Sequence, residues 1–485
     1  MGQVDFGKEQ LKNEKEMTDL LQIRFALESL VIYRQLLQDP ILAELRFLLE
    51  HLGSAHPEAI RSVASYSSLC GMLYEAGVDL KSAVIEKILH TENAFSREAE
   101  KRGAACLKGT FETAVKADLK RLQIIAGIKS DTIKKGITDH CTADGWQEDV
   151  AASLPAFPEH SLENKVYEDA LGRSVSKNNS YGECISINSY SSEVYRKISQ
   201  SGCWSDCATD LAEFHHRRGS GVFSQYSAFV WRRRDGRGYF DGVKSPDPIT
   251  FSQLISYELE RERIIENTTH FLEGYPANNI LLYGDRGTGK SSTVKALVNE
   301  YHSKGLRMIE VPKQLLTDFP VIIGQLAGRS LKYILFVDDL AFEDNEENYT
   351  ALKAVLEGGL ESRPPNVLIY ATSNRKHLIK ERFSDRAGLV SGNADDEVRA
   401  ADTIQEKLSL SDRFGMTVVF SSPDQKKYLE IVDGIIDSRG IQADREFIHR
   451  EALRWELRYN GRSPRTAKQF ADWLEGYCSI KQYST

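Results

Sequence analysis

Apolar residues in the N-terminal part of the chain recur at three- and four-residue spacing, which is typical of helices with one buried face. One such stripe consists of Ile41, Leu45, Leu48, Leu49 and Leu52, and Gly53 follows it. A second consists of Phe111, Val115, Leu119 and Leu122. Apolar stripes on helices usually pack against one another. We therefore expect residues 1–145 to form a helical domain.

The pattern loosens between residues 146 and 248, where Ser, Asn, Gly and aromatic residues are mixed. We expect a mixed α/β or loop-rich region here, ending in a linker at 245–248. Within it, the arginine-rich segment from Trp231 to Phe240 surrounds the turn-forming pair Asp235-Gly236. Apolar residues flanking such a pair predict a β-hairpin with a basic tip.

Beyond residue 250 the pattern changes to short apolar runs that alternate with helical segments. A charged amphipathic helix is expected over residues 251–272, and strands over 280–283, 308–311, 333–337, 367–371 and 417–420. This alternation indicates a parallel sheet wrapped by helices, with ligands at the carboxyl ends of the strands. We assign residues 249–422 to this α/β core and the purely helical residues 423–485 to a lid.

A phosphate-binding loop follows the first of these strands. Its residues fit G-x-x-x-x-G-K-[S/T] at every fixed position and are Gly284, Asp285, Arg286, Gly287, Thr288, Gly289, Lys290 and Ser291, with Ser292 next to them. The glycines let successive N–H groups face phosphate oxygens, and the lysine reaches the β- and γ-phosphates. The Ser291 hydroxyl is a candidate ligand of Mg²⁺. Nucleotide binding is therefore expected.

Two further strands end in polar residues suited to nucleotide hydrolysis. Four apolar residues lead into Asp338 and Asp339, which predicts that Asp338 holds Mg²⁺ and that Asp339 polarises the attacking water. Glu343 is an alternative base. The strand over 367–371 leads to Asn374, whose amide is suited to orient the water toward the γ-phosphate.

Composition narrows the classes of protein that need to be considered. The chain has 485 residues, enough for two or three domains, and a formal net charge of −8, so no global positive field draws it to nucleic acid. Its seven cysteines are scattered and odd in number, which favours reduced thiols. No apolar run reaches the ~20 residues that span a bilayer, and the N-terminus lacks a signal-peptide pattern. These features predict a cytoplasmic protein.

Taken in chain order, these motifs closely resemble an AAA+ ATPase. The resemblance is carried by the P-loop strand, the Asp-Asp strand, the strand ending at Ser373-Asn374 and the segment Ser411-Asp412-Arg413-Phe414. The resemblance covers roughly residues 251–477. Over these residues the chain is similar to an uncharacterised bacterial AAA+ family near the replication initiators and helicase loaders. The resemblance implies an α/β P-loop NTPase (AAA+) core with a C-terminal helical lid, ATP and Mg²⁺ as cofactors, and a homo-oligomer formed through the ATPase domain.

The resemblance also assigns an arginine finger. Arg413 lies where AAA+ proteins of this group carry the arginine that reaches a neighbouring subunit's γ-phosphate. Arg382 and Arg386 remain alternatives for this role.

Further implied roles lie in the lid and before the core. Arg465 corresponds to the second sensor, which touches phosphate from the same chain, with Arg462 as the alternative. Pro464 indicates the first turn of a lid helix. Ile255 and Tyr257 lie where the adenine-side segment is expected.

The function implied is that of an ATPase that hydrolyses ATP to ADP and phosphate and remodels or loads a macromolecular client. Most AAA+ enzymes have Glu where this chain has Asp339, so we expect slow, switch-like turnover. Two alternatives stay open: an initiator-like ATP switch that binds nucleic acid through the basic hairpin, and a P-loop kinase of small molecules. A GTPase is disfavoured because no Asn-Lys-x-Asp motif is found.

Overall fold

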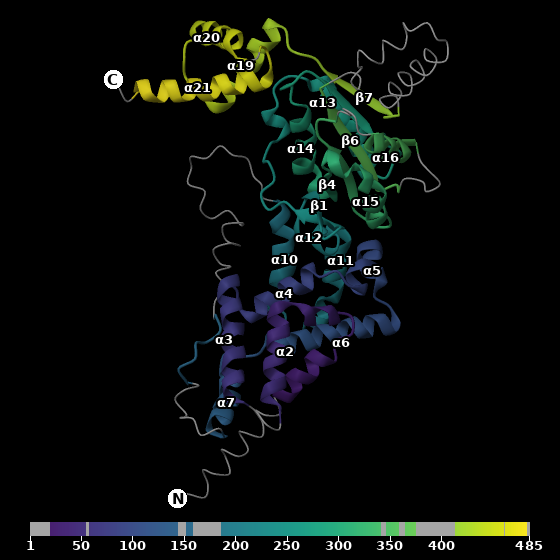
Figure 1. The fold of residues 1–485 in the computed structure, drawn as a ribbon, viewed down its shortest axis with the longest axis vertical. Coiled ribbons are helices and arrows are strands. Elements are labelled where there is room, and N and C mark those ends of the chain that lie inside the picture. Colours follow the sequence, from purple (N-terminus) through teal and green to yellow (C-terminus); the bar gives the residue numbers. More distant parts are fainter. Residues whose placement is uncertain are drawn as a thin grey trace, which may run out of the picture. The chain divides into compact units, whose positions relative to one another are not determined.

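A computed structural model of the chain describes residues 20–54, 58–143, 152–158, 186–340, 346–357, 364–374, 413–459 and 461–482. The chain divides into two compact units, Met1–Gln225 and Tyr226–Thr485 (Figure 1). Within the described ranges, no helix is both long and apolar enough to cross a membrane.

The described residues of the N-terminal unit form helices joined by turns and loops. The apolar stripes predict such helices over residues 1–145, whereas the helices between residues 186 and 225 lie in the region expected to be mixed α/β or loop-rich. Besides a helix at 20–28, the elements of this unit are η1 Arg34–Gln38, α2 Pro40–Leu52, α3 Ala59–Ala76, α4 Leu80–His90, α5 Ala94–Arg102, η2 Gly103–Cys106, α6 Gly109–Ala126, α7 Ser130–Ala143, α10 Ser186–Gln200, η3 Trp204–Cys207, α11 Ala208–Arg218 and α12 Val222–Gln225. The stripes of α2 and α6 enter one shared core, where Leu45, Leu48 and Leu119 are fully buried. Asp39 caps α2 by accepting a hydrogen bond from the Ile41 N–H, and Pro40 occupies the first turn, where its missing N–H costs nothing.

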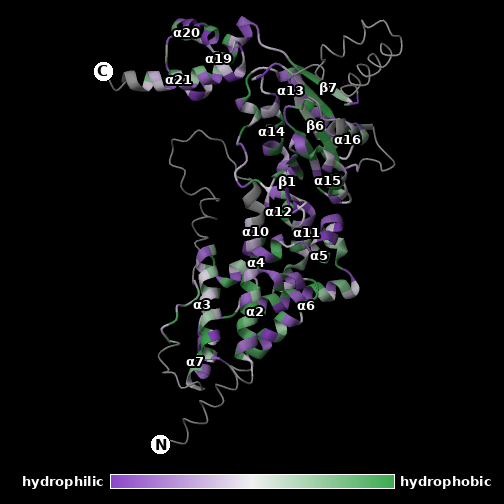
Figure 2. Ribbon diagram, in the orientation of Figure 1, coloured by the Kyte–Doolittle hydropathy of each residue, from purple (hydrophilic) through white to green (hydrophobic). Residues whose placement is uncertain are grey.

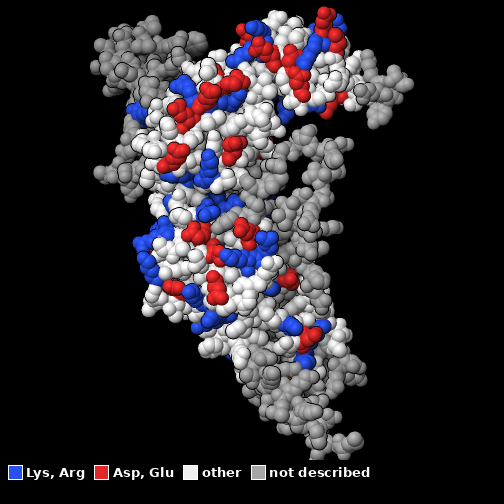
Figure 3. Space-filling view, turned by 180° about the vertical axis from the view of Figure 1, so that it is seen from behind, with Lys and Arg blue, Asp and Glu red and all other residues white. Residues whose placement is uncertain are grey.

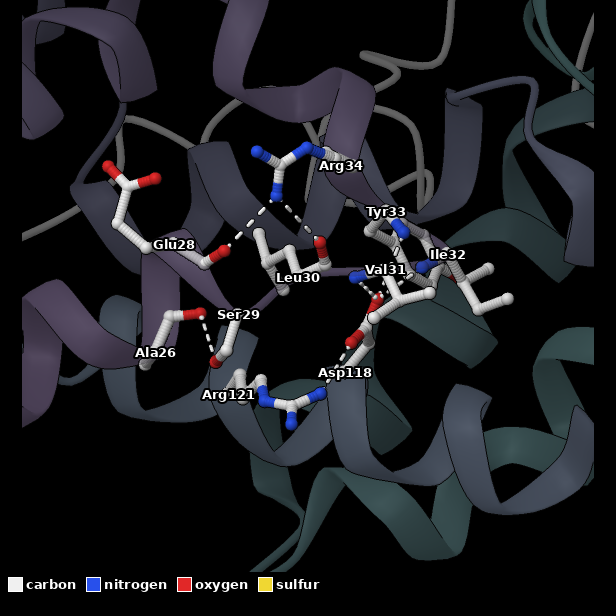
Figure 4. Close-up of polar contacts among 10 residues, drawn as sticks. All are labelled: Ala26, Glu28, Ser29, Leu30, Val31, Ile32, Tyr33, Arg34, Asp118 and Arg121. Atoms are coloured by element: carbon white, nitrogen blue, oxygen red, sulfur yellow. Dashed lines mark hydrogen bonds and ion pairs between the residues drawn. The ribbon is translucent and has the colours of Figure 1, made fainter. Parts of the chain in front are cut away.

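A buried carboxylate in α6 holds the segment between helix 20–28 and η1. Asp118 is fully buried, and its Oδ2 accepts hydrogen bonds from the backbone N–H groups of Val31 at 2.9 Å, Ile32 at 2.7 Å and Tyr33 at 3.0 Å (Figure 4). Arg121, one turn further along α6, donates to the other oxygen at 2.8 Å. The charge of the carboxylate is thus offset by three amide dipoles and one guanidinium.

The C-terminal unit contains a seven-stranded sheet in the order β2-β1-β4-β5-β6-β3-β7. The strands are β1 Ala228–Arg234, β2 Arg237–Gly242, β3 Ile280–Gly284, β4 Leu306–Glu310, β5 Lys332–Val337, β6 Val367–Ser373 and β7 Met416–Phe420. All neighbouring strands run parallel except β1 and β2. The central strands β5 and β6 are mostly apolar and almost entirely buried, as expected of a sheet covered on both faces, and Figure 2 shows β6 as hydrophobic. All five expected strands are present.

Helices flank this sheet and form the C-terminal lid. They are η4 Phe251–Gln253, α13 Glu258–Leu272, α14 Lys290–Tyr301, η5 His302–Lys304, η6 Lys313–Asp318, α15 Phe319–Leu326, α16 Glu346–Glu357 and, in the lid, α19 Gln425–Arg439, α20 Arg445–Arg458 and α21 Pro464–Gln482. The apolar sides of α13, α14 and the lid helices join one core with the strands. The expected fold class, an α/β P-loop core with a helical lid after a helical N-terminal region, is therefore confirmed.

Two expectations differ from the structure. The helix expected over 251–272 begins only at Glu258, because Ser256 and Tyr257 have φ angles of 67° and 63°, which no right-handed helix accepts. The hairpin was expected in the region 146–248, separate from the α/β core. In the structure it belongs to the C-terminal unit, because β1 pairs with β4 of the sheet. The hairpin itself is present, with Asp235-Gly236 as its turn.

The lid surface carries interspersed charges of both signs. Figure 3 shows acidic and basic side chains interspersed over the lid. Arg445 contacts Asp433 at 2.7 Å, and Arg439 contacts Asp472 at 2.7 Å. Exposed pairs of this kind contribute little to stability individually.

Candidate nucleotide site

The P-loop joins the carboxyl end of β3 to the amino end of α14, as the sequence predicts. Gly287 and Gly289 have φ angles of 78° and 92°, which favour glycine strongly. Gly284 is required for a second reason: a Cβ there would lie 2.0 Å from the carbonyl oxygen of Phe420 in β7. Because α14 begins at Lys290, its free N–H groups and positive dipole end face the loop.

Lys290 lies at the centre of the loop and is almost fully buried. Its ammonium group donates hydrogen bonds to the carbonyl oxygens of Gly284 at 2.9 Å and Asp285 at 2.7 Å, and to Oδ1 of Asn374 at 3.1 Å. Burial lowers the pKa of Lys290 from its usual value, while nearby carboxylates oppose this shift. One cation thus connects the P-loop with the end of β6, which is where a γ-phosphate needs both groups.

Ser291 and Asp338 meet in a candidate magnesium site. The Ser291 hydroxyl donates to Oδ1 of Asp338 at 2.5 Å, and the Thr372 hydroxyl donates to the same oxygen at 2.6 Å. Mg²⁺ prefers oxygen ligands and is usually held in such sites by one or two protein groups together with phosphates. The half-buried hydroxyl and carboxylate fit that requirement, so they are the residues that would hold the ion.

Asp339 is held in an unusual backbone conformation beside this pair. Its φ of 53° lies in the left-handed region, and its N–H donates to the Thr372 hydroxyl at 2.8 Å. Its side chain accepts hydrogen bonds from Asn374 at 2.6 Å and Lys313 at 3.1 Å. More than half of the side-chain surface is exposed, so water has access to the carboxylate. Non-glycine residues in this region are often found at functional sites.

Sequence reasoning missed two residues of this network. Thr372 contacts both acidic residues of the Asp-Asp pair, and Lys313 neutralises Asp339. Both lie at strand ends on the same edge of the sheet, Thr372 near the end of β6 and Lys313 at the start of η6, just after β4. That position is a signal readable from the expected strands, although it does not say which side chains meet.

The P-loop also contacts the segment that joins β7 to the lid. The N–H of Asp285 donates to the Phe420 carbonyl at 3.2 Å, and its carboxylate accepts from the Ser422 N–H at 3.0 Å. Hydrogen bonds from Ser422 lower the pKa of Asp285. Tyr257, an expected adenine-side residue, is buried here and donates its hydroxyl to the Ser421 carbonyl at 2.6 Å. Burial raises the pKa of Tyr257 to about 12.

Ile255, the second expected adenine-side residue, packs against the lid. A Cβ at Gly434 in α19 would lie 2.8 Å from the Ile255 side chain, so these two segments are in direct contact. Ile255 therefore lies between the core and the lid, on the same segment as Tyr257.

The lid places Arg465 next to the P-loop. Its backbone N–H donates to the Gly287 carbonyl at 3.2 Å, and its charge is close enough to contribute to the lowered pKa of Lys290. Pro464 begins α21, as expected. Arg462, the alternative sensor, donates instead to the buried Glu456 at 2.6 Å. The geometry thus distinguishes the two arginines and favours Arg465 as the one that faces the loop.

Arg413 lies at the amino ends of the strands, whereas the P-loop lies at their carboxyl ends. Arg413 precedes β7, whose first residue, Met416, pairs with Ile280 at the start of β3. A five-residue strand spans roughly 16 Å, so Arg413 is separated from the phosphate site of its own chain by the length of β3. Arg286 is exposed within the P-loop. The alternative base Glu343 and the alternative fingers Arg382 and Arg386 lie outside the described residues.

The chain is 25% identical over 240 residues to a protein of Methanocaldococcus jannaschii named "Putative 26S proteasome regulatory subunit homolog". The match covers 43% of this chain and 63% of the archaeal protein, which is less than two thirds of that protein's length.

Among solved structures, the chain is similar to the RuvB Holliday junction branch migration motor of Thermotoga maritima. The identity is 13%, the TM-score is 0.34, and the match covers 48% of this chain and 67% of that one. A mutant of the same protein matches with 14% identity and the same TM-score and coverage.

The match to a family model covers just over half of the chain. It extends over residues 224–478 and so includes the hairpin, the P-loop core and the lid. Its lower limit lies close to the division between the two units at Gln225 and Tyr226. The chain belongs to the family described as "Protein of unknown function (DUF815)".

Proposed function

We propose that this protein is an ATPase that binds ATP with Mg²⁺, hydrolyses it slowly to ADP and phosphate, and uses the nucleotide state to assemble and to remodel or load a macromolecular client. The observation that carries the proposal is the hydrogen-bonded network at the carboxyl edge of the sheet. In it Lys290, Asp339 and Asn374 are connected through bonds of 2.6 and 3.1 Å. Phosphoryl transfer depends on positioning and charge stabilisation of this kind.

Each residue of the network has a distinct role in the proposed reaction. Lys290 and the N-terminal amides of α14 would bind the phosphates, and Ser291 with Asp338 would hold Mg²⁺, which would supply positive charge to offset that of the phosphates. Asp339 would accept a hydrogen bond from the attacking water, and Asn374 would orient that water. Water attacks the γ-phosphorus, and the bond between this phosphorus and the bridging oxygen breaks. The bridging oxygen leaves with ADP, and one proton is released together with phosphate.

Asp339→Asn is expected to reduce ATP hydrolysis by roughly 100-fold or more while ATP still binds, because a positioned base contributes about 10²–10⁴-fold. Phosphate release and binding of a fluorescent ATP analogue measure the two effects separately. Asp247→Asn, an exposed linker substitution, is the matched control. Normal hydrolysis by Asp339→Asn would assign the base to another residue, such as Glu343.

We also propose assembly, because Arg413 lies at the amino ends of the strands, away from the P-loop of its own chain. A head-to-tail interface brings one surface of a subunit against a different surface of its neighbour. Arg413 would then complete the nucleotide site of the next subunit, where a finger arginine stabilises charge in the transition state. The helical N-terminal unit would carry the contact with the client.

Arg413→Ala is expected to lower ATP hydrolysis by about 100-fold or more without weakening ATP binding, since an arginine finger contributes about 10³–10⁵-fold. Mixing Arg413→Ala with Asp339→Asn is expected to restore part of the rate, because mixed assemblies contain sites with both groups intact. Light scattering with ATP monitors assembly, and Arg458→Ala is the control. If assembly and hydrolysis are both unchanged in Arg413→Ala, Arg413 is not the finger.

A further inference from the structure

The hairpin of β1 and β2 projects beyond the carboxyl end of β4, on the side of the sheet where the candidate nucleotide site lies. β1 pairs with β4 only over Ala228 to Val230, and its remaining residues up to Arg234 extend past the end of β4. Since β1 is parallel to β4, this extension points in the direction of the carboxyl strand ends. The turn at Asp235-Gly236, with φ angles of 50° and 74°, closes a two-residue connection.

The two faces of this ribbon differ in chemistry. On one face Trp231 is fully buried against Phe240, with ring centroids 4.9 Å apart, and Gly238 leaves no room for a Cβ beside the indole. The other face, which we call the arginine face, consists of Arg232, Arg234, Arg237 and Tyr239. Its register pairs Arg232 with Tyr239 and Arg234 with Arg237.

The arginine face contains two like charges directly opposite each other. Arg232 forms an ion pair with Asp241 at 2.7 Å, whereas Arg234 and Arg237 have no carboxylate within ion-pair distance among the described residues. The Arg234 guanidinium lies 6.0 Å from the centre of the Tyr239 ring, which is 37% exposed. Like charges at paired positions destabilise a strand pair, and a bound anion removes that cost.

The hairpin is connected to the hydrolysis site through η6. At the end of η6, the buried Asp318 accepts hydrogen bonds from the Trp231 indole at 2.8 Å and from Arg233, whose Nε lies at 2.8 Å. At the beginning of η6, Lys313 donates to Asp339 at 3.1 Å. One short helix therefore contacts both the ribbon and the proposed base.

We propose that the arginine face binds a single strand of nucleic acid, and that η6 transmits its occupancy to Asp339. The arginines would contact phosphates and Tyr239 would stack on a base, the combination typical of single-strand binding. An acidic peptide would satisfy the arginines but leave the exposed ring unused. The coupling, unlike the binding, rests on the proposed ATPase function.

Binding is tested with the full chain and a fluorescently labelled single-stranded oligonucleotide, followed by anisotropy over a range of salt concentrations. Arg234→Ala with Arg237→Ala is expected to raise Kd about tenfold or more and to reduce the salt slope by about 1.4, the value for two phosphate contacts on a single strand. Tyr239→Ala should weaken binding by about tenfold with the salt slope unchanged. Lys426→Ala with Arg458→Ala, two exposed lid residues, is the matched control.

Coupling is tested by measuring ATP hydrolysis with and without saturating oligonucleotide. The rate should change at least about twofold in the wild type, and Arg233→Ala should still bind the oligonucleotide but lose this response. A response retained in Arg233→Ala would overturn the coupling through η6.

Other outcomes would overturn the binding surface itself. These are no binding of the wild type at low salt, unchanged binding by the double arginine variant, or displacement of the oligonucleotide by polyglutamate at equal charge concentration. A fluorescent ATP analogue is titrated in the same samples. Loss of oligonucleotide binding with ATP binding intact rejects only the surface, whereas a wild type that binds the oligonucleotide but not ATP rejects the ATPase and leaves the surface standing.

Discussion

Lys290→Ala is expected to lower the affinity for ATP by about 10- to 100-fold, because hydrogen bonds to a charged group contribute roughly 1.5–3 kcal/mol. The wild-type side chain is nearly buried and surrounded by the P-loop carbonyls and Asn374, so its removal leaves a cavity without a cation where the phosphates bind. Titration with a fluorescent ATP analogue measures the change.

The control is Lys295→Ala, which removes a lysine from the same helix outside the P-loop. It should bind ATP with nearly wild-type affinity. Equal affinity of Lys290→Ala and the wild type would mean that the phosphates bind elsewhere, and the assignment of the whole site would have to be abandoned.

Asp118→Ala is expected to reduce the free energy of unfolding of the N-terminal unit by about 3–5 kcal/mol, since it removes a fully buried acceptor that serves three backbone N–H groups, one of them in the fully buried Tyr33. The same substitution removes the partner of Arg121, whose side chain is 28% exposed. Urea denaturation followed by far-ultraviolet circular dichroism measures the loss.

Arg121→Ala separates the two contributions. It removes only the partly exposed cation, while the three N–H groups keep their acceptor, so a loss of about 1 kcal/mol is expected. If Asp118→Ala costs no more than Arg121→Ala, the bonds from Val31, Ile32 and Tyr33 do not stabilise the fold as described.

The sequence predicted which residues of the candidate site lie together better than it predicted their surroundings, for a physical reason. Parallel strands bring their carboxyl ends to one edge, so the motifs ending in Ser291, Asp339 and Asn374 had to meet once the strands were recognised. Side-chain pairing is not encoded in strand order. The bonds of Thr372 and Lys313 to the two acidic residues could therefore not be predicted.

Other differences arise from backbone conformation and long-range pairing. The amphipathic pattern over 251–272 continues through Ser256 and Tyr257, and nothing in apolar spacing reveals their positive φ angles. The hairpin was recognised from its Asp-Gly turn, but its partner strand β4 lies far along the sequence. Asp118 lies among the apolar positions of α6. Only the folded structure shows which backbone N–H groups donate hydrogen bonds to its carboxylate.

Phosphate release by the purified full chain, measured with ATP and Mg²⁺ at increasing protein concentration, tests the central claim most directly. The proposed site predicts slow hydrolysis whose rate per chain increases with concentration as the sites are completed by neighbouring subunits. Lys290→Ala should show only background release under the same conditions. Release by the wild type at the background level of Lys290→Ala would contradict the claim that this site hydrolyses ATP.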